Sequence, residues 1–384
     1  MATTVITGVQ YSGIWSLAGQ ANAKALTTWP AQPTPKLFSW GSGGQGVLGL
    51  GNTTSYSSPK QVGALTDWSI VASGNATTIS VKTDGTLWTW GQNNNGQLGL
   101  GDITNRSSPV QVGALTYWAQ IAGGGLHTIA IKTDGTLWTW GSGLSGPLGL
   151  GNTTNYSSPK QVGALTTWVR AAGGNNFSVA IKTDGTLWTW GGNGSGKLGL
   201  GNTTYYSSPK QVGSLTNWLN VDTCETAILA TKTDGTLWAW GNNSKGQLGD
   251  GTIVNKSSPV QVGALTTWLN IAGGEGFVIV TKTDGTLWSW GQNNSGQLGL
   301  GNTTYYSSPK QVGALTIWLT VAAGNYHSLS ITSSGNLYSW GRNTNGQLGL
   351  GDTTARSSPN QVGSLSTWSK ISSWQTNSIG IANT

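Results

Sequence analysis

Few side chains in this chain could carry out acid–base or nucleophilic chemistry. The 384 residues include ten aspartates, two glutamates, two histidines and one cysteine. A hydrolytic site needs a nucleophile, a base and an orienting group within reach of one another. Five aspartates instead recur in the tripeptide Thr-Asp-Gly, where aspartate suits a tight turn; they are Asp84, Asp134, Asp184, Asp234 and Asp284. We therefore predict no catalytic residue and no enzymatic activity.

The histidines and the other aspartates do not form a convincing metal site. His127 and His327 occupy the same position of two distant repeats, so they could share a metal only across a central axis. We expect each to be satisfied by hydrogen bonds or exposed to solvent. Three further aspartates lie near Asn positions of other repeats, which indicates Asx turns rather than calcium ligands; they are Asp102, Asp250 and Asp352. No metal ion or cofactor is predicted.

The charge distribution does not favour a nucleic-acid partner. Charged residues make up only 8% of the chain, with a formal net charge of +7. The lysines recur at two repeat positions, so a closed ring would spread them evenly instead of forming a basic patch. Five of them stand two residues before an aspartate that offsets their charge locally; they are Lys82, Lys132, Lys182, Lys232 and Lys282.

The remaining composition excludes several classes of protein. Cys224 is the only cysteine, so we predict no intramolecular disulfide and expect a small, buried, apolar side chain. Residues 1–17 lack the basic start and apolar run of a signal peptide. No stretch approaches the roughly 18 apolar residues of a membrane span, so no membrane insertion is expected.

A repeat of fifty residues organises the chain from residue 35 to residue 384. Glycine, threonine and tryptophan are abundant, which favours short strands joined by glycine turns. Units of this length arranged radially protect their strand edges, so we predict an all-β, seven-bladed β-propeller. The dipeptide Trp-Gly recurs seven times at this spacing, at Trp40, Trp90, Trp140, Trp190, Trp240, Trp290 and Trp340.

Each unit contains a predicted β-hairpin. Residues 128–132 and 136–140 have the pattern of two strands around Thr133-Asp134-Gly135, where Asp-Gly supplies a positive φ. We expect shorter strands near residues 118–122 and 109–113 to complete this four-stranded blade. The last strand, at residues 378–382, lacks a following hairpin partner. Residues 35–41 match that partner, so the last blade should be closed by strands from both termini.

The repeat consensus combines a Val/Ile-Ala-x-Gly turn, the segment Asp-Gly-x-Leu-x-x-Trp-Gly and the run Gly-Gln-Leu-Gly-Leu-Gly with a later proline. This combination closely resembles the regulator of chromosome condensation repeat family over residues 35–384. His127 and His327 give the best matches to the family's Gly-x-x-His segment, and five units lack that histidine. The resemblance implies a propeller that binds proteins, including nucleotide exchange on a small GTPase, although no residue here specifically indicates exchange.

Otherwise near-identical units differ most in one loop. Equivalent loops of a propeller gather on one face, and loop positions that the repeated framework does not constrain can recognise a partner. Relaxed drift on an exposed loop is the competing interpretation. The candidate binding face consists of Asn75, Leu126, His127, Asn176, Phe177, Glu225, Glu275, Tyr326, His327, Trp374 and Gln375.

Residues 1–34 form a predicted N-terminal arm or anchor segment. Its sequence around Tyr11, Trp15 and Trp29 resembles short leaders of structural proteins of marine tailed phages. That resemblance implies a non-enzymatic virion protein, a tail fibre or capsid decoration. Its arm would bind other virion proteins, and its propeller would bind a host-surface protein or glycan. The alternatives are a cellular protein-interaction propeller and a lectin that holds sugars against Trp or Tyr.

Overall fold

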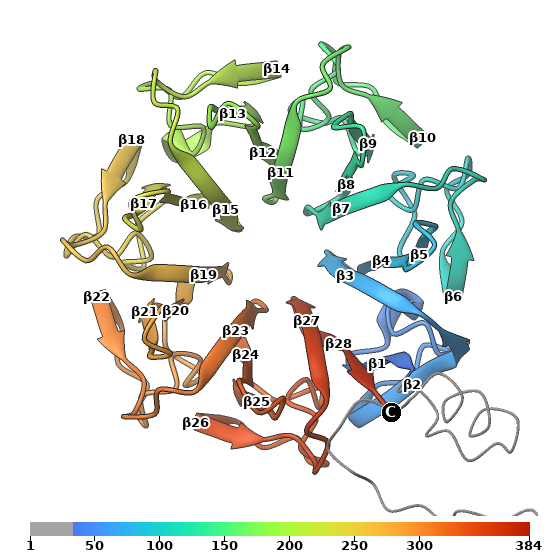
Figure 1. The fold of residues 1–384 in the computed structure, drawn as a ribbon, viewed down its shortest axis with the longest axis vertical. Coiled ribbons are helices and arrows are strands. Elements are labelled where there is room, and N and C mark those ends of the chain that lie inside the picture. The colour runs from blue at the N-terminus through green and yellow to red at the C-terminus, as the bar shows by residue number, and fades with distance from the viewer. Residues whose placement is uncertain (1–33) are drawn as a thin grey trace, which may run out of the picture. The chain divides into compact units, whose positions relative to one another are not determined.

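Residues 34–384 of the computed structural model form a ring of seven four-stranded antiparallel sheets (Figure 1). This architecture confirms the predicted all-β, seven-bladed propeller. Within this described part of the chain, the helical segments are two short 3-10 turns, η1 (Gly44–Gly46) and η2 (Gly194–Gly196). The candidate anchor residues Tyr11, Trp15 and Trp29 lie outside the described residues.

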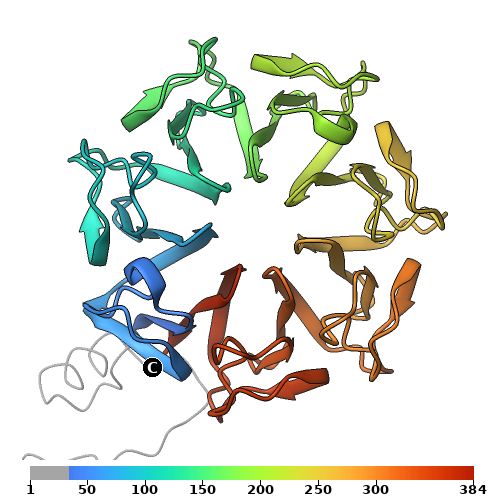
Figure 2. The same cartoon turned by 180° about the vertical axis from the view of Figure 1, so that it is seen from behind.

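Each blade runs outward from an inner strand at the ring centre, as both views show (Figures 1 and 2). Blade 1 contains β3 (Trp68–Gly74), β4 (Thr77–Lys82), β5 (Leu87–Gly91) and β6 (Arg106–Gln111). Blade 2 contains β7 (Trp118–Gly123), β8 (His127–Lys132), β9 (Leu137–Gly141) and β10 (Tyr156–Gln161). Blade 3 contains β11 (Trp168–Gly173), β12 (Phe177–Lys182), β13 (Leu187–Gly191) and β14 (Tyr206–Gln211).

The same order continues around the ring. Blade 4 contains β15 (Trp218–Cys224), β16 (Ala227–Lys232), β17 (Leu237–Gly241) and β18 (Lys256–Gln261). Blade 5 contains β19 (Trp268–Gly273), β20 (Phe277–Lys282), β21 (Leu287–Gly291) and β22 (Tyr306–Gln311). Blade 6 contains β23 (Trp318–Ala323), β24 (His327–Thr332), β25 (Leu337–Gly341) and β26 (Arg356–Gln361). Blade 7 contains β27 (Trp368–Trp374), β28 (Asn377–Asn383), β1 (Pro35–Gly41) and β2 (Tyr56–Thr66).

The outer strand of each blade follows the hairpin in sequence, which corrects one expectation. Residues 109–113 were expected to belong to the blade that contains residues 118–140. Instead β6 pairs with β5 of the preceding blade, with Trp88 opposite Gln111, and β10 completes blade 2. A periodic sequence shows how long a unit is but not where within the period one sheet ends and the next begins.

The two faces of the ring carry different loops. The loop face has the turns between inner and second strands and the long loops between third and outer strands. In blade 1, the Gln92 N–H of the long loop donates to the Ala76 carbonyl of the turn at 2.8 Å, so the turn and the loop lie side by side. The hairpin face has the Thr-Asp-Gly hairpins and the links between blades, which are joined by bonds such as Trp118 N–H to the Gly85 carbonyl at 3.3 Å. The variable turns therefore all lie on the loop face.

The hydrophobic core consists of layers between neighbouring blades. Trp190 is completely buried and packs with Ile129, Leu137 and Trp168 of its own and the preceding blade. Its indole N–H donates to the Pro147 carbonyl at 2.7 Å. The indole lies so close to Gly149 that a Cβ there would be 2.8 Å from its nitrogen, and Gly149 also has a φ of +71°. The Trp-Gly and Leu-Gly elements of the repeat thus pack directly on each other.

The recurring lysines lie against tryptophan rings. The Lys182 ammonium is 3.7 Å from the centroid of Trp188 and 5.0 Å from that of Trp168. This cation–π arrangement is repeated in the other four blades with this lysine, whereas only Lys282 among the described residues pairs with its neighbouring aspartate, at 3.7 Å. The ammonium groups of these lysines therefore interact mainly with tryptophan rings and only in one blade with the neighbouring aspartate.

The ring closes through strands from both ends of the propeller unit, as predicted. β1 pairs with β28 in unbroken register from Pro35 opposite Asn383 to Gly41 opposite Asn377. β2 then adds to the outer side of β1, so blade 7 has the order β2-β1-β28-β27. Two of its four strands therefore come from residues 35–66.

Candidate functional site at the mouth of the central channel

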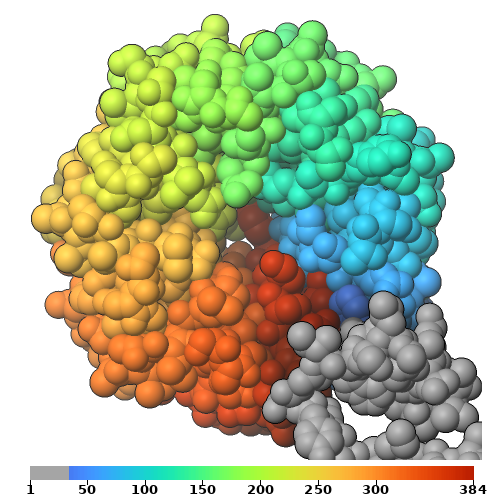
Figure 3. All heavy atoms as spheres, in the orientation of Figure 1, coloured from blue at the N-terminus to red at the C-terminus, as the bar shows by residue number. Residues whose placement is uncertain are grey.

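The inner strands surround a central channel that is visible as an opening in the space-filling view (Figure 3). Its cavity has a volume of about 290 Å³. Small side chains dominate its wall; five repeats place alanine at one equivalent position, namely Ala72, Ala122, Ala172, Ala272 and Ala322. Blade 4 has Asp222 at this position, and among the described residues Asp222 is the only charged one that lines the cavity.

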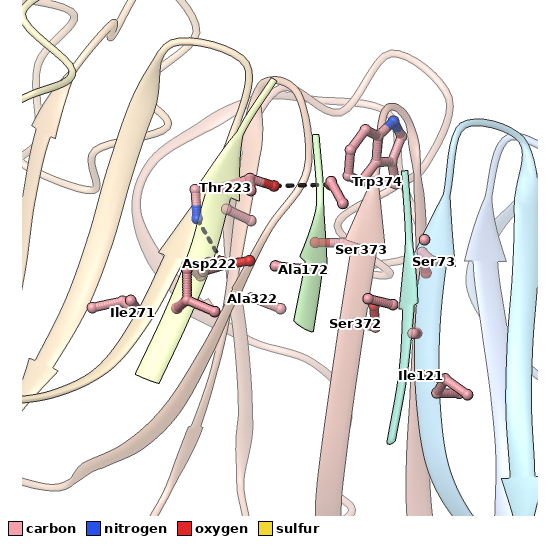
Figure 4. A pocket seen from close by; sticks show the side chains of 18 of the residues that line it. Ser73, Ile121, Ala172, Asp222, Thr223, Ile271, Ala322, Ser372, Ser373 and Trp374 are labelled. Atoms are coloured by element: carbon pink, nitrogen blue, oxygen red, sulfur yellow. Dashed lines mark hydrogen bonds between the residues drawn. The ribbon is translucent and has the colours of Figure 1, made fainter. Parts of the chain in front are cut away.

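Asp222 occupies an environment that disfavours its charge. Its Oδ2 accepts a hydrogen bond from Gly273 N–H of blade 5 at 3.1 Å (Figure 4). Burial raises the pKa of the Asp222 carboxyl to about 6, although hydrogen bonds from Thr223 and Gly273 oppose the shift. The nearby Cys224 is fully buried, as expected, and burial raises the pKa of its thiol.

The turns of the loop face place most of the predicted binding residues in half-exposed positions. They are Asn75, Leu126, Asn176, Glu225, Glu275, Tyr326, Trp374 and Gln375. Trp374 also lines the cavity, at the last position of β27, where five other repeats have glycine. Trp374 therefore stands at the junction of the channel and the loop face.

Three predicted face residues, His127, Phe177 and His327, are instead buried between blades. Each is the first residue of a second strand, and its side chain contacts the neighbouring blade. The Nε2 atoms of His127 and His327 lie 2.9 Å from the hydroxyls of Ser178 and Ser378, respectively. Burial lowers the pKa of His127 to about 4 and that of His327 to about 3, so both are neutral at pH 7. The buried position of these three residues therefore differs from the predicted exposed binding face, whereas the hydrogen bonds of the two histidines agree with the alternative that each is satisfied.

Glu225, Glu275 and Tyr326 form an interacting group across blades 4 to 6. Asn325 Nδ2 donates to Glu225 Oε1 at 3.5 Å. Burial raises the pKa of Glu225 to about 6, with a further contribution from the negative charge of Glu275. Burial and the nearby Glu275 carboxylate raise the pKa of Tyr326 to about 12. These groups can accept hydrogen bonds and attract positive charge.

The sequence of the chain matches one family over most of its length. Seven segments match the regulator of chromosome condensation (RCC1) repeat, at residues 36–81, 84–131, 134–181, 184–222, 234–281, 284–331 and 334–375. The chain belongs to this family. Its RCC1 repeats coincide with the Trp-Gly period, which confirms the predicted family resemblance.

Solved structures share the RCC1 propeller fold. Prp20p from Saccharomyces cerevisiae is 22% identical with a TM-score of 0.81, and the match covers 92% of each chain. Human WBSCR16 is 22% identical with a TM-score of 0.82, covering 91% of this chain and 99% of that one. Yeast RCC1 (Prp20), solved bound to Kap60, is 21% identical with a TM-score of 0.82, covering 100% and 96%. At this identity the likeness shows the fold alone. Among proteins with curated functions, none matches the chain in sequence.

The RCC1 repeat matches lie within residues 36–375 and give no support to the virion role that the N-terminal segment suggested. Residues 34–384 contain no helix long and apolar enough to cross a membrane. The same residues contain no group of three or more His, Cys, Asp or Glu side chains placed to hold a metal ion.

Sequence reasoning missed Asp222 in this RCC1 propeller. The signal was present, because an aspartate stands at a position where five of the seven repeats have alanine and one has serine. It also missed Arg342, whose guanidinium lies 5.6 Å from the centroid of the Tyr326 ring. Asp222 lies on an inner strand, whereas Arg342 is the first residue after β25, in the long loop of blade 6.

Replacing Asp222 with Asn should stabilise the propeller at neutral pH. The folded-state pKa of about 6 exceeds the ordinary value of 3.8, so the unfolded chain ionises first and stability is lost as pH rises through this range. Two pKa units correspond to about 3 kcal/mol, so D222N should gain about 2–3 kcal/mol at pH 7. Asn can still accept the bond from Gly273.

Urea unfolding of D222N and the unsubstituted protein at pH 7 and pH 4 measures this difference. The gain should nearly vanish at pH 4, where Asp222 is protonated in the folded state. The difference between the two proteins must be compared, because the buried neutral histidines also lower the stability of both as pH falls below about 6.5. An equal gain at both pH values would contradict the assignment.

Proposed function

We propose that this RCC1-repeat protein is a non-enzymatic interaction protein that binds a partner protein through its loop face. One observation carries the proposal: the residues that break the sevenfold repeat gather around one channel mouth. Glu225, Glu275 and Tyr326 interact with one another there, and Trp374 joins the turns to the cavity. An asymmetric set of half-exposed aromatic and acidic side chains is suited to specific recognition.

The hairpin face is less suited to a specific contact because its surface repeats. Every blade presents a partly exposed leucine from the link before its inner strand, for example Leu115 at 48% and Leu165 at 49% exposure. A partner on such a face would meet nearly the same surface in seven orientations. The loop face offers one orientation only.

Structural relatives support a protein as the partner class. Prp20p is described with binding properties to Gsp1p and histones, and yeast RCC1 (Prp20) was solved bound to Kap60. Gsp1p, histones and Kap60 are partners of these relatives. For this chain they favour the general role of a protein-binding propeller, with exchange-factor-like partner binding as one form of it.

The variant Y326S/W374S should lose partner binding while keeping a folded ring. Each aromatic residue is half-exposed, so its removal costs little packing, whereas a central aromatic contact is commonly worth about 2 kcal/mol or more in a protein interface. A photo-crosslinker at Gln375 would identify the partner in lysate of the producing organism. Calorimetry with the purified partner should then show an affinity at least about tenfold weaker.

The matched control is L115S/L165S, which removes two comparably exposed side chains from the hairpin face. It should bind the partner as tightly as the unsubstituted protein. Loss of binding in this control, with normal binding by Y326S/W374S, would assign the interaction to the opposite face.

A further inference from the structure

The acidic residues of the propeller are distributed unevenly. Most aspartates stabilise turns, as Asp184 does by accepting bonds from the Thr186 N–H and hydroxyl at 2.9 and 2.6 Å. The four ion pairs within residues 34–384 involve Asp102, Asp250, Asp284 and Asp352. Asp67, Asp222 and both glutamates remain. Asp67 is exposed on the hairpin face, whereas Asp222 and the glutamates lie on blades 4 and 5 beside the channel. None of these last three carboxylates has a basic ion-pair partner among the described residues.

Aromatic rings accompany these carboxylates. Tyr326 lies near Glu275, whose negative charge contributes to the raised pKa of the tyrosine, and Trp374 lines the same cavity as Asp222. Figure 4 shows Asp222 and Trp374 on different inner strands at opposite sides of the view. Trp374 is also the only tryptophan within residues 34–384 outside the recurring framework positions. Carboxylates combined with aromatic faces favour a desolvated organic cation.

Two buried hydroxyls in the cavity independently indicate a missing polar partner. Ser73 and Ser373 are 5% and 6% exposed, and their Oγ atoms have no hydrogen-bond partner among residues 34–384. Both residues line the cavity, and both are labelled within it in Figure 4. Buried polar groups are normally paired, so a ligand that donates several hydrogen bonds would complete the site. An ammonium has three such donors and a guanidinium has five.

The size of the cavity restricts the ligand further. Its volume of about 290 Å³ lies near the lower end of small-ligand sites, which typically span about 300–1,000 Å³. One extended side chain would fit, whereas a large cofactor would not. Arg342 faces Tyr326, but it forms no ion pair with Asp222, Glu225 or Glu275.

We propose that Asp222, Glu225, Glu275, Tyr326 and Trp374, termed here the acidic mouth, bind one lysine or arginine side chain of the partner protein. This inference rests on the proposed function and adds the chemistry that the partner must present. The cationic group enters from the loop face, pairs with the carboxylates and stacks against the aromatic rings. Its distal N–H groups reach the hydroxyls of Ser73 and Ser373.

The indole signal of Trp374 reports on this site directly. The full chain would be labelled with 15N-tryptophan, and the Trp374 resonance would be assigned from the W374F variant. Nine-residue Gly-Ser peptides with a central Lys, Arg or Gln are the probes, and butylammonium tests a free amine. The Lys and Arg peptides should shift the Trp374 signal saturably and bind at least about tenfold more tightly than the Gln peptide.

E225Q/E275Q should weaken binding of the Lys and Arg peptides at least about tenfold, because it keeps the side-chain shapes and removes the charges. The matched control D67N removes an exposed carboxylate from the hairpin face and should bind like the unsubstituted protein. Equal binding of the Lys and Gln peptides, or unchanged binding to E225Q/E275Q, would overturn the proposal. If butylammonium binds as tightly as the Lys peptide, the site recognises a free amine, and the conclusion that the cation comes from a partner protein fails.

The same variants separate this inference from the proposed function. If Y326S/W374S abolishes partner binding but E225Q/E275Q leaves it within twofold, the protein-binding function stands and the cationic pocket fails. If the partner binds elsewhere while the Lys peptide still shifts Trp374, the pocket stands and the proposed partner face fails.

Discussion

A protein truncated to begin at residue 42 should fail to form a closed ring. The truncation removes β1, which lies between β28 and β2 and contributes the completely buried Leu37 and Trp40. Loss of one such leucine or tryptophan costs about 2–5 kcal/mol, so their combined loss approaches the whole stability of about 5–15 kcal/mol of a typical domain. The exposed edge of β28 should also promote association between chains.

Thermal melting of two truncations tests this expectation. The matched control begins at residue 34 and retains every described strand, so it should melt cooperatively and near the temperature of the full chain. The chain that begins at residue 42 should melt at least about 10 °C lower or aggregate. A peptide of residues 34–66 added separately should restore part of the lost stability. A melting temperature within about 2 °C of the control would mean that β1 does not close the ring.

Replacement of Trp190 with Ala should be the most damaging single core substitution tested. Trp190 fills the layer between blades 2 and 3, packs edge-on against Trp168 with centroids 6.2 Å apart, and donates to the Pro147 carbonyl. Truncating a buried tryptophan leaves a cavity and typically costs about 3–5 kcal/mol. The Pro147 carbonyl would also lose one of its two donors and keep only the Ser178 hydroxyl.

W188A is the matched control because it deletes the same side chain two residues away at a half-buried position. Its loss should be at most about half that of W190A, since the exposed part of the ring contributes little burial. D184A removes only turn hydrogen bonds at the surface and should cost under about 1.5 kcal/mol. Chemical denaturation of the three variants gives the comparison. Similar losses for W190A and D184A would show that the assigned core is wrong.

Much of the fold could be predicted because its signals are local and repeated. The Asp-Gly turns define the hairpins, and the constant Trp-Gly spacing defines the number of blades. The prediction that residues 35–41 complete the last blade followed from the same pattern. The outer strand was assigned to the wrong blade, because a long loop separates it from its partner and periodicity does not reveal which of two neighbouring strands it joins.

The candidate site was predicted less completely. The variable turns were recognised, but His127, Phe177 and His327 were included in the candidate binding face, although a hydrogen-bonded position was also expected for the two histidines. Their side chains lie between blades because each residue begins a second strand. At a strand end, a shift of one residue changes whether a side chain faces solvent or the core. Asp222 was missed although it replaces a recurring alanine.

The sequence by itself determined a ring of seven blades, its closure by both ends of the repeat region and the presence of one variable turn in every blade. These features depend on short-range turn chemistry and on a period that comparison of successive units reveals. Only the tertiary structure decided that Asp222 and Trp374 line one cavity and that the turns with Glu225, Glu275 and Tyr326 follow the inner strands on the same face. These residues come from four blades, and Asn325 reaches Glu225 across a separation of 100 residues. Such proximity arises from the curvature of the closed ring, which brings the inner strands of all blades to one axis.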